Sequence, residues 1–200
     1  LISDFVECIA VDVNDNIWFG TSVGAQMFDG TSWTSYNTSS FPTIPSDNIK
    51  VINTMSNGDV WIGTDFGASR FDGVNWITYT TSTMQSVPLI SNQIRSIDED
   101  LNTGIVWIGT NIGITPLDLG GVTNSLSIGS PELHWSGVNA TAFDSNGDKW
   151  FASPLGGVTH FDGTTFTNYN TSNGLLSQNV TALLIDNQDN KWIGTDLGMS

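Results

Sequence analysis

Two kinds of residue in this chain could do chemistry: the carboxylates of its Asn- and Asp-rich turns, and its two histidines. The turns that begin at Asp12, Asp144 and Asp186 alternate Asp with Asn or a second acidic residue, which resembles the start of a calcium loop. An EF-hand loop also needs glycine at its sixth position and glutamate at its twelfth, and the turns at Asp12 and Asp144 have neither. The carboxylates are therefore predicted to cap their own turns, and no metal site is predicted.

The histidines support only an open hypothesis. His160 lies in a short apolar segment and is predicted to be a half-exposed strand residue. His134 lies in a long connection with Glu132, and a lyase or hydrolase that uses this pair is one alternative. The chain has no nucleophile-elbow motif, zinc-spaced Cys/His set or phosphate-binding glycine loop, so no catalytic residue and no cofactor is assigned. The lone cysteine, Cys8, is predicted to be a small buried side chain.

One pattern recurs five times and must position these residues. It is a Trp and an apolar residue followed by Gly-Thr, and it begins at Trp18, Trp61, Trp107 and Trp192. The copy at Trp150 reads Trp-Phe-Ala-Ser. Successive tryptophans are 42–46 residues apart, and a period near that length is typical of repeat architectures.

Each repeat contains four short segments that are rich in β-branched or aromatic residues. The first segments cover residues 6–12, 49–55, 94–100, 138–144 and 180–186. Asp-Gly pairs at Asp29, Asp72 and Asp162 favour hairpin turns between the third and fourth segments. No window shows sustained helical spacing of apolar residues, so almost no helix is expected. The pattern predicts an all-β fold, a β-propeller of four-stranded antiparallel blades in which the recurring tryptophan packs between blades.

The whole chain, residues 1–200, is predicted to be a single β-propeller segment of about 4.5 blades. Blades are expected near residues 1–40, 41–85, 86–130 and 131–172, with 173–200 an incomplete fifth. A longer first turn at residues 100–104 and a last segment without tryptophan predict looser outer strands in the third blade. Because the end supplies no outer strands, the segment is expected to belong to a larger propeller.

The repeats resemble the two-component-regulator propeller repeat over nearly the whole chain. The motif is clearest in residues 57–68, where an Asn-Gly-Asp turn precedes Trp61-Ile62-Gly63-Thr64 and a Gly-Ala pair follows. The resemblance implies about seven blades, of the kind found in the extracytoplasmic sensor halves of bacterial hybrid two-component regulators, which respond to oligosaccharides. Such repeats also occur in other secreted or surface proteins. The blades are similar to those of the streptogramin-lyase group as well, which leaves an enzyme open.

The candidate binding site follows from propeller geometry, in which ligands usually lie where the innermost strands begin. The second residue of each first segment is polar and differs in every copy: Glu7, Lys50, Arg95, Asn139 and Thr181. The preceding loops add Asp4, Asp47, Asn92, Trp135 and Gln178. We expect these residues to ring the mouth of the central channel and bind ligand. The alternative, that they only reach channel water, stays open.

Charge limits the choice of partner. Five Lys and Arg against twenty Asp and Glu give a net charge of −15, which argues against nucleic acid and against an anionic membrane surface. No apolar run is long enough to span a membrane. The favoured function is a non-enzymatic, extracytoplasmic bacterial sensor or binding module, periplasmic, cell-surface or secreted, for a polar small molecule, an oligosaccharide or a protein partner. The alternatives are a structural or protein-interaction platform of a surface or secretion assembly, and a propeller lyase or hydrolase.

Overall fold

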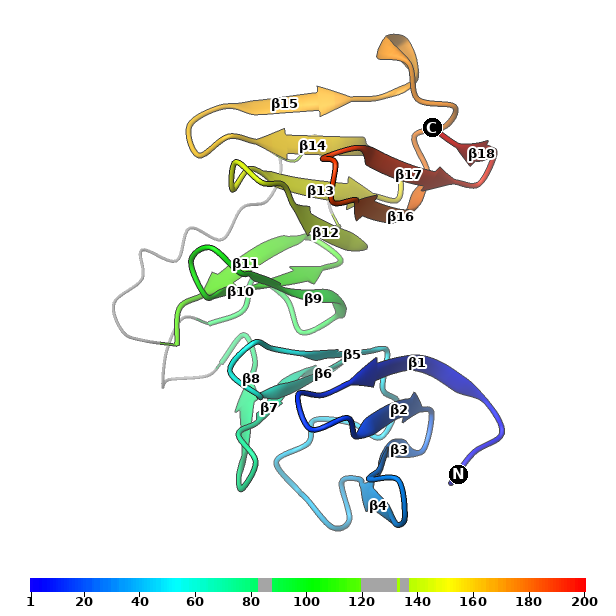
Figure 1. Ribbon diagram of the computed structural model, residues 1–200, viewed down its shortest axis with the longest axis vertical. Coiled ribbons are helices and arrows are strands. Elements are labelled where there is room, and N and C mark those ends of the chain that lie inside the picture. The colour runs from blue at the N-terminus through cyan, green and yellow to red at the C-terminus, as the bar shows by residue number, and fades with distance from the viewer. Residues whose placement is uncertain (83–87, 120–132, 134–136) are drawn as a thin grey trace. The chain divides into compact units, whose positions relative to one another are not determined.

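The computed structural model describes residues 1–82, 88–119, 133 and 137–200. In these ranges the chain forms eighteen strands and one 3₁₀ turn, Thr171–Asn173, and no α-helix (Figure 1). The strands build five antiparallel sheets, and in each sheet the strands follow one another in chain order. The predicted all-β propeller meander is confirmed.

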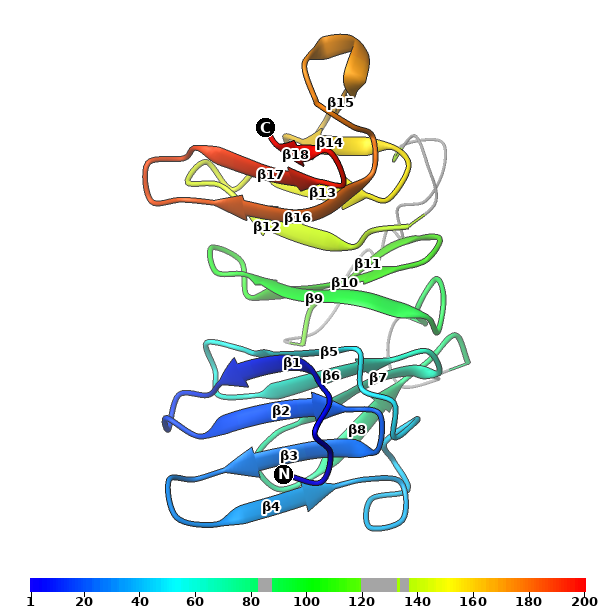
Figure 2. The same ribbon diagram turned by 90° about the vertical axis from the view of Figure 1, so that its right-hand side faces the viewer.

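Residues Leu1–Glu99 form one compact unit that contains the first and second sheets. The first sheet consists of β1 (Val6–Val11), β2 (Ile17–Thr21), β3 (Gly24–Phe28) and β4 (Trp33–Tyr36). The second sheet consists of β5 (Val51–Thr54), β6 (Val60–Thr64), β7 (Gly67–Phe71) and β8 (Trp76–Tyr79). Figure 2 shows the four strands of the first sheet side by side in sequence order.

Residues Asp100–Ser200 form the second compact unit. The third sheet consists of β9 (Ile94–Asp100), of which all but Asp100 belongs to the first unit, and of β10 (Ile105–Thr110) and β11 (Gly113–Leu117) of the second unit. The fourth sheet consists of β12 (Ala140–Phe143), β13 (Lys149–Ser153), β14 (Gly157–Phe161) and β15 (Phe166–Tyr169). The fifth sheet consists of β16 (Val180–Ile185), β17 (Lys191–Thr195) and β18 (Gly198–Met199). The last segment predicted for the third blade, residues 124–128, lies outside the described residues, and the predicted blade boundaries stay a prediction.

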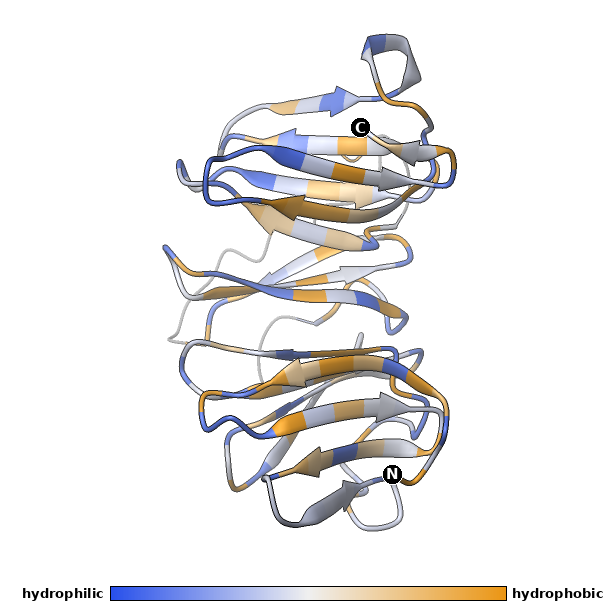
Figure 3. Cartoon of the chain, turned by 45° about the vertical axis from the view of Figure 1, so that its right-hand side comes forward, coloured by the Kyte–Doolittle hydropathy of each residue, from blue (hydrophilic) through white to orange (hydrophobic). Residues whose placement is uncertain are grey.

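Neighbouring sheets pack through the alternating apolar positions of their strands, which appear as orange bands in Figure 3. Between the first and second sheets, Trp18 stacks on Tyr36 with ring centroids 5.1 Å apart and also meets Phe71 of the second sheet at 6.0 Å. Ile52 and Ile62 complete this core from the second sheet. Each large apolar side chain buried here contributes about 1.5–3 kcal/mol. The recurring tryptophan therefore holds one blade against the next, as the repeat predicts.

The glycine of the Trp-x-Gly-Thr strand is explained by this close packing. A Cβ atom on Gly63 would lie 2.5 Å from Val51 Cγ1 and 2.5 Å from Ile94 Cγ2, closer than carbon atoms approach. In the fourth sheet the equivalent residue is Ala152, which lies opposite the small Ala140. The position therefore demands the smallest side chain that its neighbours allow.

Candidate functional site

In the first, fourth and fifth sheets, the aspartate at the start of the first turn caps that turn and also accepts a hydrogen bond from the tryptophan of the repeat. Asp12 Oδ1 accepts hydrogen bonds from the backbone N–H groups of Asn14 and Asn16, and Asp12 Oδ2 accepts one from Trp18 Nε1 at 2.9 Å. Asp144 and Asp186 accept the same indole bond at 3.0 Å and 2.8 Å. Burial opposes ionisation of Asp12, but these hydrogen bonds, led by that from Trp18, hold its pKa below 3.8. The predicted capping role is confirmed.

A lysine from the following sheet completes this arrangement in the second unit. Lys191 Nζ lies 3.2 Å from Asp144 Oδ2 and 5.1 Å from the centre of the Trp150 ring. Lys149 Nζ lies 3.3 Å from Asp100 Oδ2 at the equivalent position one blade earlier. These pairs were not predicted from the sequence, although a lysine directly after the turns that end at Asp148 and Asn190 was the available signal. We call the set Asp144, Trp150 and Lys191 the junction clamp. At Asp100 the ion pair is present, but the Trp107 Nε1 group has no hydrogen-bond partner among the described residues.

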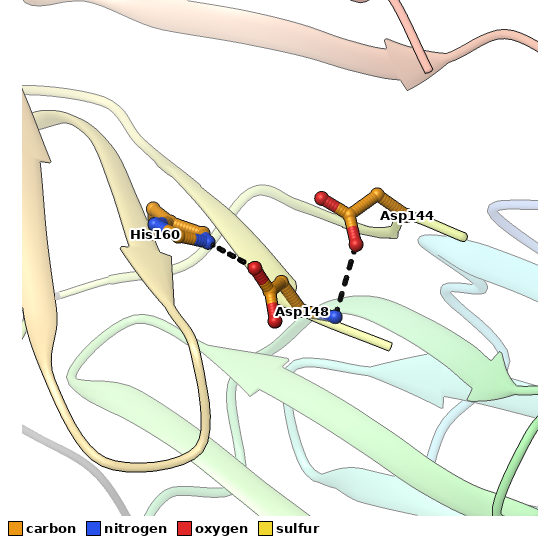
Figure 4. Close-up of side chains that lie close together, drawn as sticks. All are labelled: Asp144, Asp148 and His160. Atoms are coloured by element: carbon orange, nitrogen blue, oxygen red, sulfur yellow. Dashed lines mark hydrogen bonds and ion pairs between the residues drawn. The ribbon is translucent and has the colours of Figure 1, made fainter. Parts of the chain in front are cut away.

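Three side chains could hold a metal ion, because ligand atoms of Asp144, Asp148 and His160 all lie within 4.8 Å of one another (Figure 4). However, His160 Nε2 already contacts Asp148 Oδ2 at 2.8 Å, and both oxygens of Asp144 accept hydrogen bonds. The second sheet has Arg70 at the register position of His160, and Arg70 Nε contacts Asp59 Oδ2 at 2.6 Å. Because guanidinium does not bind metal ions, the feature that the two sheets share is a hydrogen bond between a basic side chain and a carboxylate. His160 is half-buried in β14, close to the prediction of a half-exposed strand residue.

Glu132 and His134 of the enzymatic hypothesis lie outside the described residues, as does Trp135 of the predicted binding site, so these calls stay predictions. Burial raises the pKa of the Cys8 thiol to about 11, although backbone hydrogen bonds from Ile52 and Gly20 oppose it. Cys8 is therefore a neutral, half-buried side chain at neutral pH, in agreement with its predicted packing role.

The predicted inner-strand residues lie at the start of the first strand of each sheet. Glu7, Arg95 and Thr181 are the second residues of β1, β9 and β16. Lys50 and Asn139 instead lie one residue before β5 and β12, so the predicted strand position is wrong for these two. The reason is that regular pairing begins only at the following residue, although both backbone N–H groups already donate to the neighbouring strand.

Two of these residues lie at irregularities in the ladder. The register of β1 with β2 shifts between Val6 and Cys8, and that of β16 with β17 shifts between Val180 and Ala182. The unpaired residues at these shifts are Glu7 and Thr181, and both are exposed. A bulge redirects a side chain away from the regular pleat and is frequent next to binding sites.

The inner-strand position also holds the two basic side chains that form no ion pair within the described residues. Of the five Lys and Arg, three form the ion pairs described above: Arg70, Lys149 and Lys191. Within the described residues, Lys50 and Arg95 form no ion pair, and Glu7 forms none either. These three residues begin the inner strands of the first, second and third sheets, all within the first unit.

The loop residues of the predicted site have structural partners. Asp47 accepts hydrogen bonds from the backbone N–H of Thr38 at 2.7 Å and from its hydroxyl at 3.1 Å. Asn92 Oδ1 accepts the backbone N–H of Thr81 at 2.8 Å. Gln178 Nε2 donates to Thr171 Oγ1 at 3.3 Å. Each of these three side chains therefore forms a hydrogen bond within its own connection between two sheets. Asp4, by contrast, is exposed.

Comparison with known proteins agrees with the fold. A model of the two component regulator propeller matches residues 1–23. A comparison with curated proteins gives no match. The family model confirms the resemblance inferred from the repeats.

Solved structures extend the likeness to the whole chain. The extracellular domain of a B. thetaiotaomicron protein described as a hybrid two component system shares 22% identity with a TM-score of 0.81, over 99% of this chain and 27% of that one. PorZ, a surface component of the type-IX secretion system of Porphyromonas gingivalis, shares 21% identity with a TM-score of 0.72, over 97% of this chain and 31% of that one. Virginiamycin B lyase from Staphylococcus aureus shares 16% identity with a TM-score of 0.70, over 98% and 68%. The chain thus spans about a quarter of the sensor domain it matches, and the shared property is the propeller fold.

In the parts of the chain that the structure describes, no helix has the length and apolar character that a membrane crossing requires.

Proposed function

We propose that this chain is part of an extracytoplasmic sensor propeller and that it binds a polar ligand at the inner-strand ends of its first unit. The observation that carries the proposal is the position of Lys50 and Arg95. They are the two cations without ion-pair partners in the described residues, and they recur at one register position together with Glu7. Unpaired charges kept at one place in successive sheets indicate a role in binding rather than in folding. The likeness to a sensor's extracellular domain and to a surface secretion component supports the location.

The charge pattern favours an acidic oligosaccharide. A guanidinium binds a carboxylate through two parallel hydrogen bonds, and an ammonium adds a point charge. Glu7 is an acceptor that could receive sugar hydroxyl groups. A uronate-containing oligosaccharide matches this set of groups better than a neutral sugar does.

Isothermal titration calorimetry with oligogalacturonate, and with malto-oligosaccharide as the neutral comparison, tests this function. Arg95→Ala and Lys50→Ala should each weaken oligogalacturonate binding about 10-fold or more, because a hydrogen bond to a charged group contributes about 1.5–3 kcal/mol. Their thermal stability should stay close to wild type, since Arg95 is exposed and Lys50 half-buried without an ion pair.

Lys191→Ala is the matched control, because it removes a cation that the junction clamp uses. It should lower stability and leave the affinity unchanged. If the wild-type chain binds neither sugar, or if Arg95→Ala and Lys191→Ala affect affinity equally, the proposed site is wrong.

A protein-interaction platform is the second candidate. The turn between the second and third strands exposes one large apolar side chain in every sheet: Val23, Phe66, Ile112, Leu155 and Leu197. Such side chains at a turn tip are suited to contact another protein. Phe66→Ser and Leu155→Ser should then abolish binding to a protein partner while leaving oligosaccharide binding intact. The lyase hypothesis would need turnover that is lost on His134→Ala.

A further inference from the structure

In the second sheet, an amide and a cation flank the buried residue through which the chain enters the inner strand. Ile49 is fully buried, whereas Asn48 before it and Lys50 after it are half-buried. The backbone N–H of Ile49 donates to the carbonyl oxygen of Thr21 in the first sheet at 2.9 Å. That of Lys50 donates to the carbonyl oxygen of Gly63 in its own sheet at 2.9 Å. Because successive N–H groups point in opposite directions along an extended strand, Asn48 and Lys50 share the face opposite Ile49.

The third sheet repeats this arrangement one blade later. Ile94, the first residue of β9, is fully buried. Gln93 before it and Arg95 after it are both exposed. Burial thus alternates with the period of two that a strand imposes, and Gln93 and Arg95 also share one face. We call Asn48 with Lys50, and Gln93 with Arg95, the two amide–cation pairs.

The two pairs lie at the starts of neighbouring inner strands of the first unit. A Cβ atom on Gly63 would lie 2.5 Å from both Val51 Cγ1 and Ile94 Cγ2, so the starts of β5 and β9 flank the same point. Further along, Asn53 Nδ2 on β5 donates to the carbonyl oxygen of Ile97 on β9 at 2.7 Å. The two strands therefore run in the same direction, and both pairs are at the same end.

The amides of both pairs are available to a ligand. The backbone N–H of Asn48 donates to Ser46 Oγ, and that of Gln93 donates to Ser91 Oγ, each at 3.2 Å. These bonds hold the main chain, and neither the Asn48 nor the Gln93 side chain has a hydrogen-bond partner among the described residues. A primary amide offers two donors and an acceptor, which suits it to sugar hydroxyl groups.

We propose that each amide–cation pair is a subsite for one uronate of the ligand. The cation, Lys50 or Arg95, binds the carboxylate, and the amide, Asn48 or Gln93, binds hydroxyl groups of the same sugar ring. Residues two apart on a strand are separated by about 7 Å, which allows both groups to contact opposite ends of one uronate. Neighbouring strands then bind two uronates of one chain. The inference rests on the proposed function, and it adds the groups that recognise the sugar in addition to its charge.

Isothermal titration calorimetry with tetragalacturonate and with the galacturonate monomer tests the two subsites. Wild type should bind the tetramer about 10-fold or more tightly than the monomer, because filling one subsite brings the next uronate to the other. Asn48→Ala and Gln93→Ala should each weaken tetramer binding about 3- to 10-fold, since each loses hydrogen bonds to the sugar. The double variant should lose about the product of the two factors, because the amides contact different rings. Thermal stability should stay at the wild-type value in all three.

Gln178→Ala is the matched control. Gln178 is also an amide in a connection between sheets, but its Nε2 donates to Thr171 Oγ1 at 3.3 Å. Its removal should leave tetramer affinity unchanged. If wild type binds the tetramer and Arg95→Ala weakens binding, but both amide variants bind as wild type does, the subsites are wrong and the proposed function stands. Equal affinity for monomer and tetramer, or an equal loss in Gln178→Ala, would also overturn the subsites. A wild type that binds no galacturonate would overturn both proposals.

Discussion

The glycine two residues after the recurring tryptophan determines how closely one sheet approaches the next. Gly63→Ala would bring a methyl group within 2.5 Å of Val51 and Ile94, so we expect it to lower the free energy of unfolding by about 1–3 kcal/mol. Gly194→Ala is the matched control, because its Cβ would lie 3.3 Å from Ala182. It should cost clearly less, as the natural Ala152 opposite Ala140 indicates. Urea denaturation measures both changes, and equal stabilities would contradict the tight packing of β6 against β9.

The junction clamp gives a second residue-scale prediction. Asp144 is buried and holds Trp150, Lys191 and two backbone N–H groups. Asp144→Ala leaves these donors without a partner and should cost about 3–5 kcal/mol, measured by thermal and urea denaturation. Asp186→Ala changes the same position where no following sheet covers it, and should shift the melting temperature much less. Equal shifts would mean that burial by the next sheet does not strengthen the clamp.

At the scale of the secondary-structure elements, short side-chain ties shape the connections between sheets. Asp47→Ala removes the acceptor for the N–H and hydroxyl of Thr38 and should reduce stability by about 1 kcal/mol. Oligosaccharide affinity should change little, because the carboxylate is engaged in the fold. Asn48→Ala, at the neighbouring residue, is the control for stability. A large loss of affinity in Asp47→Ala without loss of stability would indicate that Asp47 contacts the ligand, as the sequence predicts.

The strands and turns could be predicted from the sequence, because Trp-x-Gly-Thr, the Asp-Gly pairs and the Asn-rich turns act locally. The part played by Asp47, Asn92 and Gln178 could not, since it depends on how each connection folds back. The bulges at Glu7 and Thr181 and the position of Lys50 depend on register, which single strands do not reveal. Lys149 and Lys191 bind carboxylates one blade earlier, so only the packing of sheets makes them neighbours.

At the scale of the whole molecule, the many hydrogen-bonded carboxylates make the free energy of unfolding fall as the pH falls. Aspartates across the described residues have a pKa held below the ordinary 3.8, among them Asp12, Asp29, Asp72, Asp144, Asp162, Asp186, Asp189 and Asp196. Because the unfolded chain takes up protons first, their contribution is complete above about pH 4 and is lost as the pH falls through the lower folded values.

The urea midpoint should therefore fall steeply below about pH 4. Asp12→Asn should be less stable at pH 7 than wild type, because Asn cannot accept both the backbone and the indole hydrogen bonds at Asp12, and its stability should depend less on acid. Denaturation series at pH 3, 4, 5 and 7 measure this. An acid dependence identical in both proteins would remove Asp12 from the titrating set.

The junction clamp also affects which duplications or insertions of repeats the fold can accept. Lys149 and Lys191, in the fourth and fifth sheets, pair with the turn aspartate of the preceding sheet, Asp100 and Asp144 respectively. The fourth repeat therefore carries both a donor for its predecessor, Lys149, and an acceptor for its successor, Asp144. A tandem duplication of the fourth repeat would create a new junction with both parts already present, whereas insertion of a repeat without the lysine would leave a buried carboxylate without its ion-pair partner. Lengthening by whole units, in one orientation, is the change in chain length that this architecture tolerates most readily.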